Sequence, residues 1–166
     1  MQKLIGKDSY GCDDLIQIVK ILRSPKGCPW DRAQTHTSLK PYCIEEAAEV
    51  IGGINIWEAT GDAENLKEEL GDLLLQILLH AQIAEEEGLF TIREVMDEAS
   101  EKMIRRHPHV FGKPMLSEQG EPITEWEAIK KQEKAGKEWT EAYLPGALDE
   151  AKKLIERAEC RKGIKK

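Results

Sequence analysis

The sequence is poor in aromatic residues and has no long hydrophobic run. Phe, Trp and Tyr make up 5% of its 166 residues, whereas charged residues make up 33% and hydrophobic residues 40%. This balance is typical of helical proteins rather than strand-rich folds, so we expect an all-α fold. No apolar stretch reaches membrane-spanning length and no signal peptide is visible, so we expect no membrane partner.

The cysteines lack any recognisable spacing. The sequence holds 4 of them, and none forms the C-x-x-C pattern of zinc or redox motifs: Cys12, Cys28, Cys43 and Cys160. We therefore expect reduced thiols in a cytoplasmic, reducing setting, and favour this over a zinc site.

A basic excess is missing as well, because the formal net charge is -7. Proteins that bind the phosphate backbone of nucleic acids need a net basic surface, so we expect no nucleic-acid partner. The basic segment 161–166 leaves nucleic-acid binding as a weaker alternative. An acidic protein that acts on polyphosphates must reverse its charge locally, which bound metal and a few placed cations can do.

The length fits one domain with its own core and additional residues at its ends. We place this domain at 1–144 and a helical, basic segment at 145–166. Asp13 or Asp14 is the expected cap of the first helix. Caps, glycines and prolines predict that this helix runs to about 22 and that a loop follows at 24–31. A second helix is predicted to start between 35 and 41 and to end at about 57, and a third to span about 63–87. The last two are predicted from 91 to before Pro108 and from 124 to about 137.

The second and third of these helices form the centre of the predicted fold. The polar turn around Gly61 folds them into an antiparallel hairpin. Both helices carry apolar residues beyond one stripe, among them Ile51 and Leu79, so we expect dimerisation to complete the bundle. Helical spacing predicts the buried stripe of the third helix: Leu66, Leu70, Leu73, Leu74, Ile77, Leu78 and Ala81.

Each helix of the hairpin carries a pair of carboxylates on one face. Glu46 precedes Glu49, and Glu69 precedes Asp72, at the E-x-x-E and E-x-x-D spacing of one helical turn. Converging carboxylates with no Lys or Arg at the intervening helical positions repel one another, so a counter-charge is expected. Oxygen ligands suit a hard divalent ion, Mg²⁺ with Mn²⁺ as a substitute. The alternative is a solvated acidic face, which charge runs on helices usually are.

These acidic residues resemble a known pattern. Glu45, Glu46, Glu49, Glu69 and Asp72 match the E-E-x-x-E, spacer, E-x-x-D arrangement of the all-α nucleoside triphosphate pyrophosphohydrolases. Three further stretches resemble MazG proteins in order and spacing: residues 27–31 (GCPWD), 71–76 (GDLLLQ) and 105–112 (RRHPHVFG). The resemblance covers about residues 15–134 and identifies the chain as similar to a single MazG-like domain.

The resemblance implies Mg²⁺-dependent hydrolysis of nucleoside triphosphates to monophosphate and pyrophosphate, with broad specificity, in a homodimer or higher helical assembly. The four paired carboxylates would hold the ions, and Glu45 would orient water or support a ligand. Many members of the family carry a second similar domain after this point. The sequence does not decide between a natural one-domain form and a fragment.

The resemblance also implies substrate-binding residues after the hairpin. Lys102 and Arg106 match cations that face the triphosphate, and Trp126 and Lys130 match a W-x-x-x-K pair of the nucleotide pocket. From the residues alone, cations near a helix C-terminus are also favoured by the helix dipole without any function. Trp126 equally suits packing against the core or a partner chain.

A rival interpretation from another class is a helical metal-binding or protein-interaction module without hydrolytic activity. Release of pyrophosphate with Mg²⁺ distinguishes the two. No residue pattern fixes hydrogen bonds to one base, so the sequence predicts no preferred nucleotide.

Overall fold

The computed structural model is helical, which confirms the predicted all-α class. It describes residues 4–112, 115–117, 119–120, 122–123 and 126–164. The chain forms two compact units, one of Met1–Ile92 with Ala151–Lys166 and one of Arg93–Glu150. The four cysteines are free thiols. No helix in the described part is both long and apolar enough to span a membrane.

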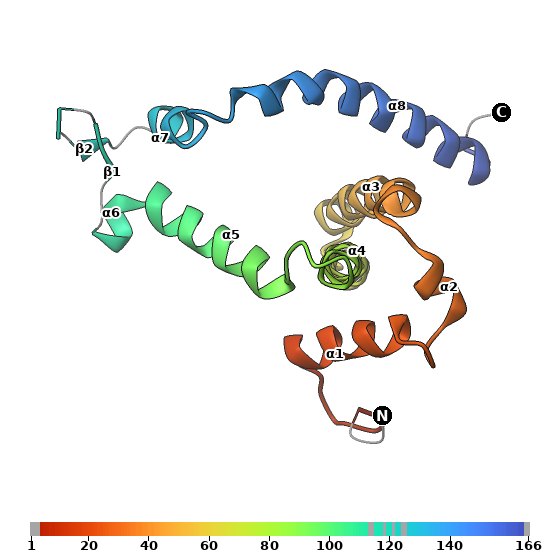
Figure 1. Ribbon diagram of the computed structural model, residues 1–166. Coiled ribbons are helices and arrows are strands. Elements are labelled where there is room, and N and C mark those ends of the chain that lie inside the picture. Colours follow the sequence, from red (N-terminus) through yellow and green to blue (C-terminus); the bar gives the residue numbers. More distant parts are fainter. Residues whose placement is uncertain (1–3, 113–114, 118, 121, 124–125, 165–166) are drawn as a thin grey trace. The chain divides into compact units, whose positions relative to one another are not determined.

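The first unit is built on a long antiparallel helix hairpin. Helix α3 (His36–Thr60) and helix α4 (Glu64–Glu86) lie side by side in Figure 1, which views them nearly along their axes. Gly61 ends α3 in the left-handed conformation, at φ 77°, which a glycine adopts without strain. The Asp62 carboxylate then accepts a hydrogen bond from the backbone N–H of Glu64, 2.9 Å away, and starts α4. The predicted hairpin therefore forms at the predicted turn.

Helix α3 begins inside the predicted window. Thr35 caps it, because its hydroxyl accepts a hydrogen bond from the backbone N–H of Ser38 at 3.1 Å and the Ser38 side chain returns to the Thr35 backbone. Pro41 lies inside the helix near its start. The helix extends to Thr60, a little beyond the predicted end at Trp57.

Two shorter helices pack beside the hairpin in this unit. They are α1 (Cys12–Arg23) and α2 (Pro29–Ala33), and the last part of α8 (Leu144–Arg161) also belongs here. The predicted cap of α1 was wrong: Gly11 is the N-cap, and the Asp14 side chain accepts its backbone N–H at 3.1 Å. The loop predicted at 24–31 was wrong at its end, because α2 starts at Pro29. Proline suits the first position of a helix, where the backbone N–H has no partner within the helix.

The core lies where α1 meets the second half of the hairpin. Its buried cluster consists of Val19, Leu39, Leu78, Leu79 and Ile83. The predicted stripe was wrong at Leu70, Leu74 and Ile77, which are 50%, 38% and 45% exposed. The prediction that Leu79 lies outside the buried stripe was also wrong, because Leu79 belongs to the core cluster. Polar contacts from α1 reach Glu85 and Glu86 near the end of α4, and α1 covers that end of the helix.

The second unit holds the remaining elements. These are α5 (Ile92–Arg106), α6 (Pro108–Phe111), the antiparallel two-residue strands β1 (Met115–Leu116) and β2 (Pro122–Ile123), α7 (Trp126–Glu133) and the short helix η1 (Glu138–Tyr143). Helix α5 ends before Pro108, as predicted. Helix α7 ends earlier than predicted, and the expected capping box at Thr124 lies outside the described residues. Ile129 of α7 is fully buried.

Candidate active site

The hairpin brings three of the predicted acidic residues together. Glu46 and Glu49 lie one turn apart on α3, and Glu69 reaches the same place from α4. One carboxylate oxygen from each lies within 4.8 Å of the other two. All three side chains are partly buried. The antiparallel crossing therefore turns two sequence motifs into one acidic cluster.

Asp72 is exposed and lies outside this three-residue group, yet its charge reaches it. Burial raises the pKa of Glu46 above its ordinary value, and the negative charges of Asp72, Glu69 and Glu45 raise that pKa further. The positive charge of Lys162 lowers the same pKa and partly offsets them. Placing these carboxylates together therefore costs free energy, which a bound cation would recover.

The donor chemistry of the cluster fits a hard divalent ion. Its ligand atoms are carboxylate oxygens, and the described residues of the group include neither His nor Cys. Mg²⁺ and Mn²⁺ take such oxygen ligands, whereas zinc and copper favour nitrogen or sulfur. Glu46, Glu49 and Glu69 can therefore hold a metal ion, and Asp72 is near enough to add charge.

Three contacts to the acidic residues were not predicted from the sequence. The Asn65 side-chain amide donates to Oε1 of Glu69 at 2.9 Å, from one turn earlier on α4. Arg161 forms an ion pair with Glu45, and Lys162 forms one with Glu49. The spacing of Asn65 from Glu69 could have revealed the first contact, since positions four apart share a helix face. No local signal marks the other two.

Cys43 and two histidines form a chain of contacts between the two helices of the hairpin. The Sγ of Cys43 lies 3.2 Å from Nε2 of His80, and Nδ1 of His80 lies 2.7 Å from Nδ1 of His36. Burial raises the pKa of the Cys43 thiol, and the charge of Glu46 adds to this. Burial lowers the pKa of His80, and the neighbouring His36 lowers it further. Both shifts favour the uncharged forms of the Cys43 thiol and the His80 ring.

Among the predicted substrate residues, Arg106 and Trp126 lie together in the second unit. The Arg106 guanidinium lies 5.1 Å from the centre of the Trp126 ring. Its Nε and Nη2 donate to Oε2 of Glu133 at 2.9 and 2.7 Å, and Arg105 pairs with the other oxygen at 3.3 Å. Burial raises the pKa of Glu133, but the hydrogen bonds and charges of the two arginines outweigh it and hold that pKa below its ordinary value. Arg106 thus ties α5 to α7 in this unit.

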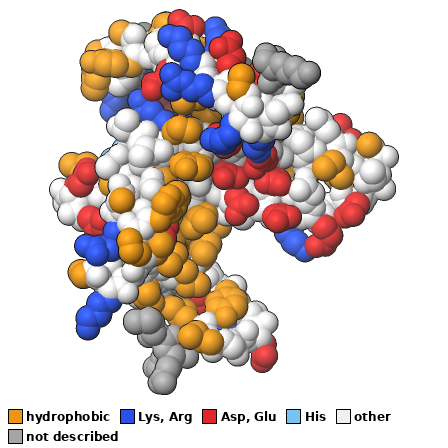
Figure 2. All heavy atoms as spheres, turned by 90° about the vertical axis from the view of Figure 1, so that its right-hand side faces the viewer, with side chains coloured by type: hydrophobic (Ala, Val, Ile, Leu, Met, Phe, Trp, Pro, Cys, Tyr) orange, Lys and Arg blue, Asp and Glu red, His pale blue; other side chains and the backbone are white. Residues whose placement is uncertain are grey.

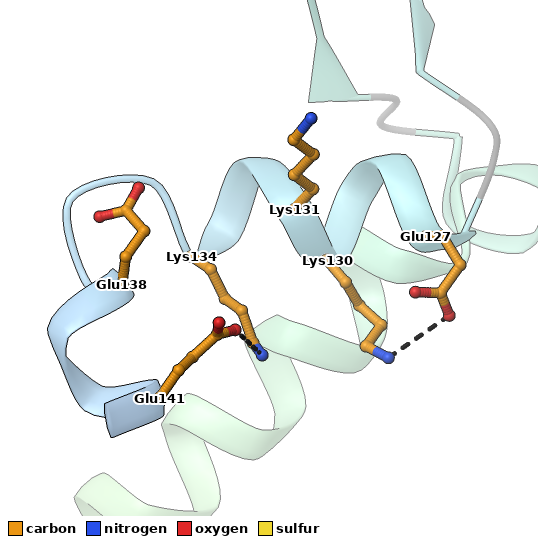
Figure 3. Close-up of a pocket in the computed structure, with 6 residues that line it drawn as sticks. All are labelled: Glu127, Lys130, Lys131, Lys134, Glu138 and Glu141. Atoms are coloured by element: carbon orange, nitrogen blue, oxygen red, sulfur yellow. Dashed lines mark hydrogen bonds and ion pairs between the residues drawn. The ribbon is translucent and has the colours of Figure 1, made fainter. Parts of the chain in front are cut away.

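Lys102 and Lys130 also have acidic partners. The Lys102 ammonium lies 3.9 Å from Glu98 on the same helix, and the Lys130 ammonium lies 3.4 Å from Glu127. Figure 3 shows Lys130 directed toward Glu127 and Lys131 directed away from it. Lys130, Lys131 and Lys134 line a cavity of about 360 Å³ together with Glu127, Glu138 and Glu141. The glutamates of this lining oppose an anion, and two of them already pair with Lys130 and Lys134.

The family model for the MazG nucleotide pyrophosphohydrolase domain matches residues 34–111. These residues form a MazG domain. The match includes the five predicted acidic site residues, as well as Lys102 and Arg106, whereas Trp126 and Lys130 lie beyond it. The predicted family resemblance is confirmed.

Curated relatives of this MazG domain carry matching names. The chain is 54% identical over 125 residues to the nucleoside triphosphate pyrophosphohydrolase/pyrophosphatase MazG of Thermotoga maritima, covering 75% of this chain and 46% of that protein. It is 43% identical over 126 residues to the nucleoside triphosphate pyrophosphohydrolase of Escherichia coli strain K12, covering 75% and 46%. It is 52% identical over 117 residues to the Bacillus subtilis protein YabN, covering 70% and 23%. The chain therefore spans less than half the length of these relatives.

Proposed function

We propose that this chain hydrolyses nucleoside triphosphates between the α- and β-phosphates, using Mg²⁺, with broad specificity for the base. The observation that carries the proposal is the cluster of Glu46, Glu49 and Glu69 inside the MazG domain, with one oxygen of each within 4.8 Å of the others. The relatives named nucleoside triphosphate pyrophosphohydrolase support the same reaction class.

The carboxylates of the hairpin hold the metal in this proposal. Glu46, Glu49, Glu69 and Asp72 are the proposed ligands, and the Asn65 amide fixes the orientation of the Glu69 carboxylate. Glu45, next to Glu46 but turned away from it on the helix, is proposed to orient water or support a ligand. When bound, divalent ions activate water as Lewis acids and neutralise charge on the departing pyrophosphate.

The reaction consumes one water per triphosphate. The water oxygen bonds to the α-phosphorus, the bond from that phosphorus to the bridging oxygen breaks, and pyrophosphate leaves with the bond's electrons. Glu45 accepts the hydrogen bond of the attacking water in this scheme and so directs its lone pair. The two protons of the water pass to the product phosphates or to the solvent, so the enzyme ends unchanged.

The basic residues of the second unit are proposed to bind the substrate. Lys102, Arg106 and Lys130 would neutralise phosphate oxygens, and Trp126 would stack on the nucleoside. Since Arg106 and Lys130 pair with Glu133 and Glu127, substrate binding must exchange those ion pairs for phosphate contacts. Such exchange favours a ligand of high charge over a neutral nucleoside.

We propose a homodimer as the active assembly. Large apolar side chains of α3 and α4 are exposed to solvent, and Figure 2 shows hydrophobic side chains on the surface. Ile51 is 60% exposed, Trp57 48% and Leu70 50%. A second copy can cover such faces symmetrically. Light scattering at micromolar concentration tests this proposal, and a mass near 18.8 kDa would contradict it.

The activity is tested with a panel of ribo- and deoxyribonucleoside triphosphates, with Mg²⁺ and with EDTA. We expect monophosphate and pyrophosphate in equal amounts, resolved by ³¹P NMR or ion-exchange chromatography. Nucleoside diphosphate with orthophosphate as primary products would reject the proposal. Stable folded protein that binds Mg²⁺ but releases no pyrophosphate would favour the interaction-module alternative.

Matched variants connect the activity to the cluster. Glu69→Gln keeps the size of the side chain and removes its charge, so we expect activity to fall at least about 100-fold. Glu68→Gln changes the neighbouring exposed residue by the same chemistry and should leave activity within about twofold. Equal activity in both variants would remove Glu69 from the site.

A further inference from the structure

The last residue of α8, Arg161, and the residue that follows it, Lys162, contact the acidic motif of α3. Nη2 of Arg161 pairs with Oε2 of Glu45, and Nζ of Lys162 pairs with Oε1 of Glu49. The partners are more than one hundred residues apart in sequence, and both belong to the first unit. Figure 2 shows a patch of Asp and Glu side chains with Lys and Arg side chains along its border. Two cations therefore reach the acidic motif of α3, whose own segment 44–50 contains no Lys or Arg.

Lys162 engages a carboxylate that the metal would use, and Arg161 engages a carboxylate beside the site. Glu49 is one of the three residues whose oxygens converge, and Glu45 precedes Glu46 directly. Glu45 has only 10% of its side chain exposed, so the Arg161 contact is made on a largely covered carboxylate. Arg161 and Lys162 themselves are 57% and 42% exposed and can leave without unfolding a core. Breaking these ion pairs therefore exposes no core, and its only cost is the lost attraction between opposite charges.

We propose that Arg161 and Lys162 are a tethered counter-charge that competes with the divalent ion for the carboxylates of α3. The inference rests on the proposed function, because it takes the metal to bind at this cluster. Without metal, the two cations relieve the repulsion among the glutamates. When a divalent ion arrives, its own charge replaces theirs, and the end of α8 separates from α3.

Competition follows from charge as well as from shared atoms. A divalent ion and an ammonium repel one another, and the repulsion grows where protein has displaced water. The contact between α8 and α3 has a closed state and an open state. If the metal binds the open state, the closed contact lowers the affinity for metal, and the metal weakens the contact by the same factor. Arg161 and Lys162 therefore weaken metal affinity, and the metal weakens their attachment to α3.

The test measures Mn²⁺ binding without nucleotide, by the electron paramagnetic resonance signal of the unbound ion. We compare the wild type with the double variant Arg161→Gln/Lys162→Gln. The control is Lys153→Gln/Arg157→Gln, which removes the same number of charges from α8. Within the described part of the chain, Lys153 and Arg157 form no ion pair with an acidic residue. Two surface ion pairs set the expected scale, a gain in Mn²⁺ affinity of about threefold to tenfold for the first variant. The control variant should change the affinity less than about twofold.

Equal affinities in the two double variants would overturn the proposal, since general charge would then explain any change. A thermal melt provides a second readout that does not depend on activity. Adding Mn²⁺ should raise the melting temperature of Arg161→Gln/Lys162→Gln more than that of the wild type, because tighter binding to the native state stabilises it more. If the double variant does not fold, Arg161→Gln and Lys162→Gln alone carry the same test, each with an expected gain of about twofold to threefold.

The variant Glu46→Gln/Glu69→Gln separates this inference from the proposed function. If the wild type binds Mn²⁺ and this variant does not, the metal site is supported, whatever the result for the Arg161→Gln/Lys162→Gln variant. If that holds and the counter-charge variant equals its control, only the inference fails. If the wild type binds no Mn²⁺, or if Glu46→Gln/Glu69→Gln binds it as the wild type does, the metal site and the inference fail together.

Discussion

Gly53 of α3 lies directly against the backbone of Leu66 in α4. A Cβ atom built on Gly53 would stand 2.8 Å from Cα and 3.0 Å from the backbone nitrogen of Leu66. The two helices therefore approach here at a distance that only glycine permits. Glu49 lies one turn before Gly53 and Glu69 one turn after Leu66. This contact thus sets the separation of the carboxylates from the two helices.

Adding one methyl group at Gly53 should disturb this crossing. Alanine is the better helix former, but here its Cβ would force the backbones apart, so we expect Gly53→Ala to lose about 1–3 kcal/mol of unfolding free energy. Mn²⁺ binding should weaken with it, since Glu69 would move away from Glu46 and Glu49. Gly52→Ala is the control, because a Cβ there meets no atom within 4 Å in the described structure. Urea unfolding should find Gly52→Ala as stable as the wild type or up to about 1 kcal/mol more stable. Equal stability of the two variants would contradict the close contact.

Arg23 ties α1 to the end of α4. Only 5% of its side chain is exposed, and its Nε and Nη2 donate to the two oxygens of Glu86 at 3.0 and 2.8 Å. Its Nη1 donates to the backbone carbonyl oxygens of Asp31 and Gln34 at 2.5 and 3.2 Å. Lysine cannot reproduce this fork, so Arg23→Lys should lose about 1–3 kcal/mol in urea unfolding. The exposed Arg32 donates one hydrogen bond, to Pro25, and Arg32→Lys should lose less than about 0.5 kcal/mol.

The same pair predicts a pH dependence of stability. The hydrogen bond from Arg23 holds the pKa of Glu86 below its ordinary value, aided by Gln82 and opposed by burial. A carboxyl whose pKa is lower in the folded protein binds protons first in the unfolded chain. Its stabilising contribution is therefore complete above the unfolded pKa of about 4.3 and is lost as the pH falls through the folded pKa. Unfolding free energies measured from pH 7 to 3 should decline less steeply for Glu86→Gln than for the wild type. A parallel decline in both proteins would show that Glu86 is not the group that titrates.

The sequence was sufficient to predict the hairpin and the acidic pairs because both depend on local rules. Gly61 ends a helix through its own backbone freedom, and the three-residue spacing of Glu46 and Glu49 places them on one face in any helix. The buried stripe failed at Leu70, Leu74 and Ile77 because α4 is apolar on more than one face. Periodicity shows which positions are apolar, but the neighbouring helix α1 decides which of them it covers.

The unpredicted contacts are long-range and depend on tertiary packing. Lys162 and Glu49 meet only because the end of α8 returns to α3, and no spacing along the chain encodes that return. His80 and Cys43 approach one another across the hairpin in the same way. Such pairs could have been found only after the hairpin register was known, since Cys43 then faces the second half of α4.

The two lysines of α7 offer a matched test of substrate binding. Lys130 and Lys131 are neighbours with the same charge, but Figure 3 shows them pointing in different directions. If Lys130 meets charge that develops in the transition state, Lys130→Ala should lower kcat about 10-fold or more and raise KM as well. Lys131→Ala should leave both constants within about twofold. Loss of activity in both variants alike would assign the effect to the charge of the helix.

Trp126 should act on binding more than on chemistry. Its ring lies beneath the Arg106 guanidinium and 5.5 Å from the ring of His107. If the ring stacks on the nucleoside, Trp126→Ala removes contacts that exist equally in the ground state and the transition state, so KM should rise several-fold while kcat changes little. Trp126→Phe retains an aromatic face and should recover most of the loss. Wild-type kinetics for Trp126→Ala would assign this residue to packing in its unit.

Asp72 distinguishes a metal site from an acidic cluster that only supports the fold. If its carboxylate held the fold through ion pairs or hydrogen bonds, Asp72→Asn would destabilise the metal-free protein, because its partners would be left unsatisfied. Asp72 is exposed and its negative charge acts on Glu46, so we expect the opposite: without metal, stability should hold or rise as repulsion is relieved. Added Mg²⁺ should raise the melting temperature of the wild type more than that of Asp72→Asn, because binding to the native state stabilises it by mass action. The measurement is a set of thermal melts in EDTA and in Mg²⁺, paired with the pyrophosphate assay and with Glu68→Gln as the control for a simple loss of charge. An Asp72→Asn protein that melts lower in EDTA and keeps its activity would exclude Asp72 from the metal site.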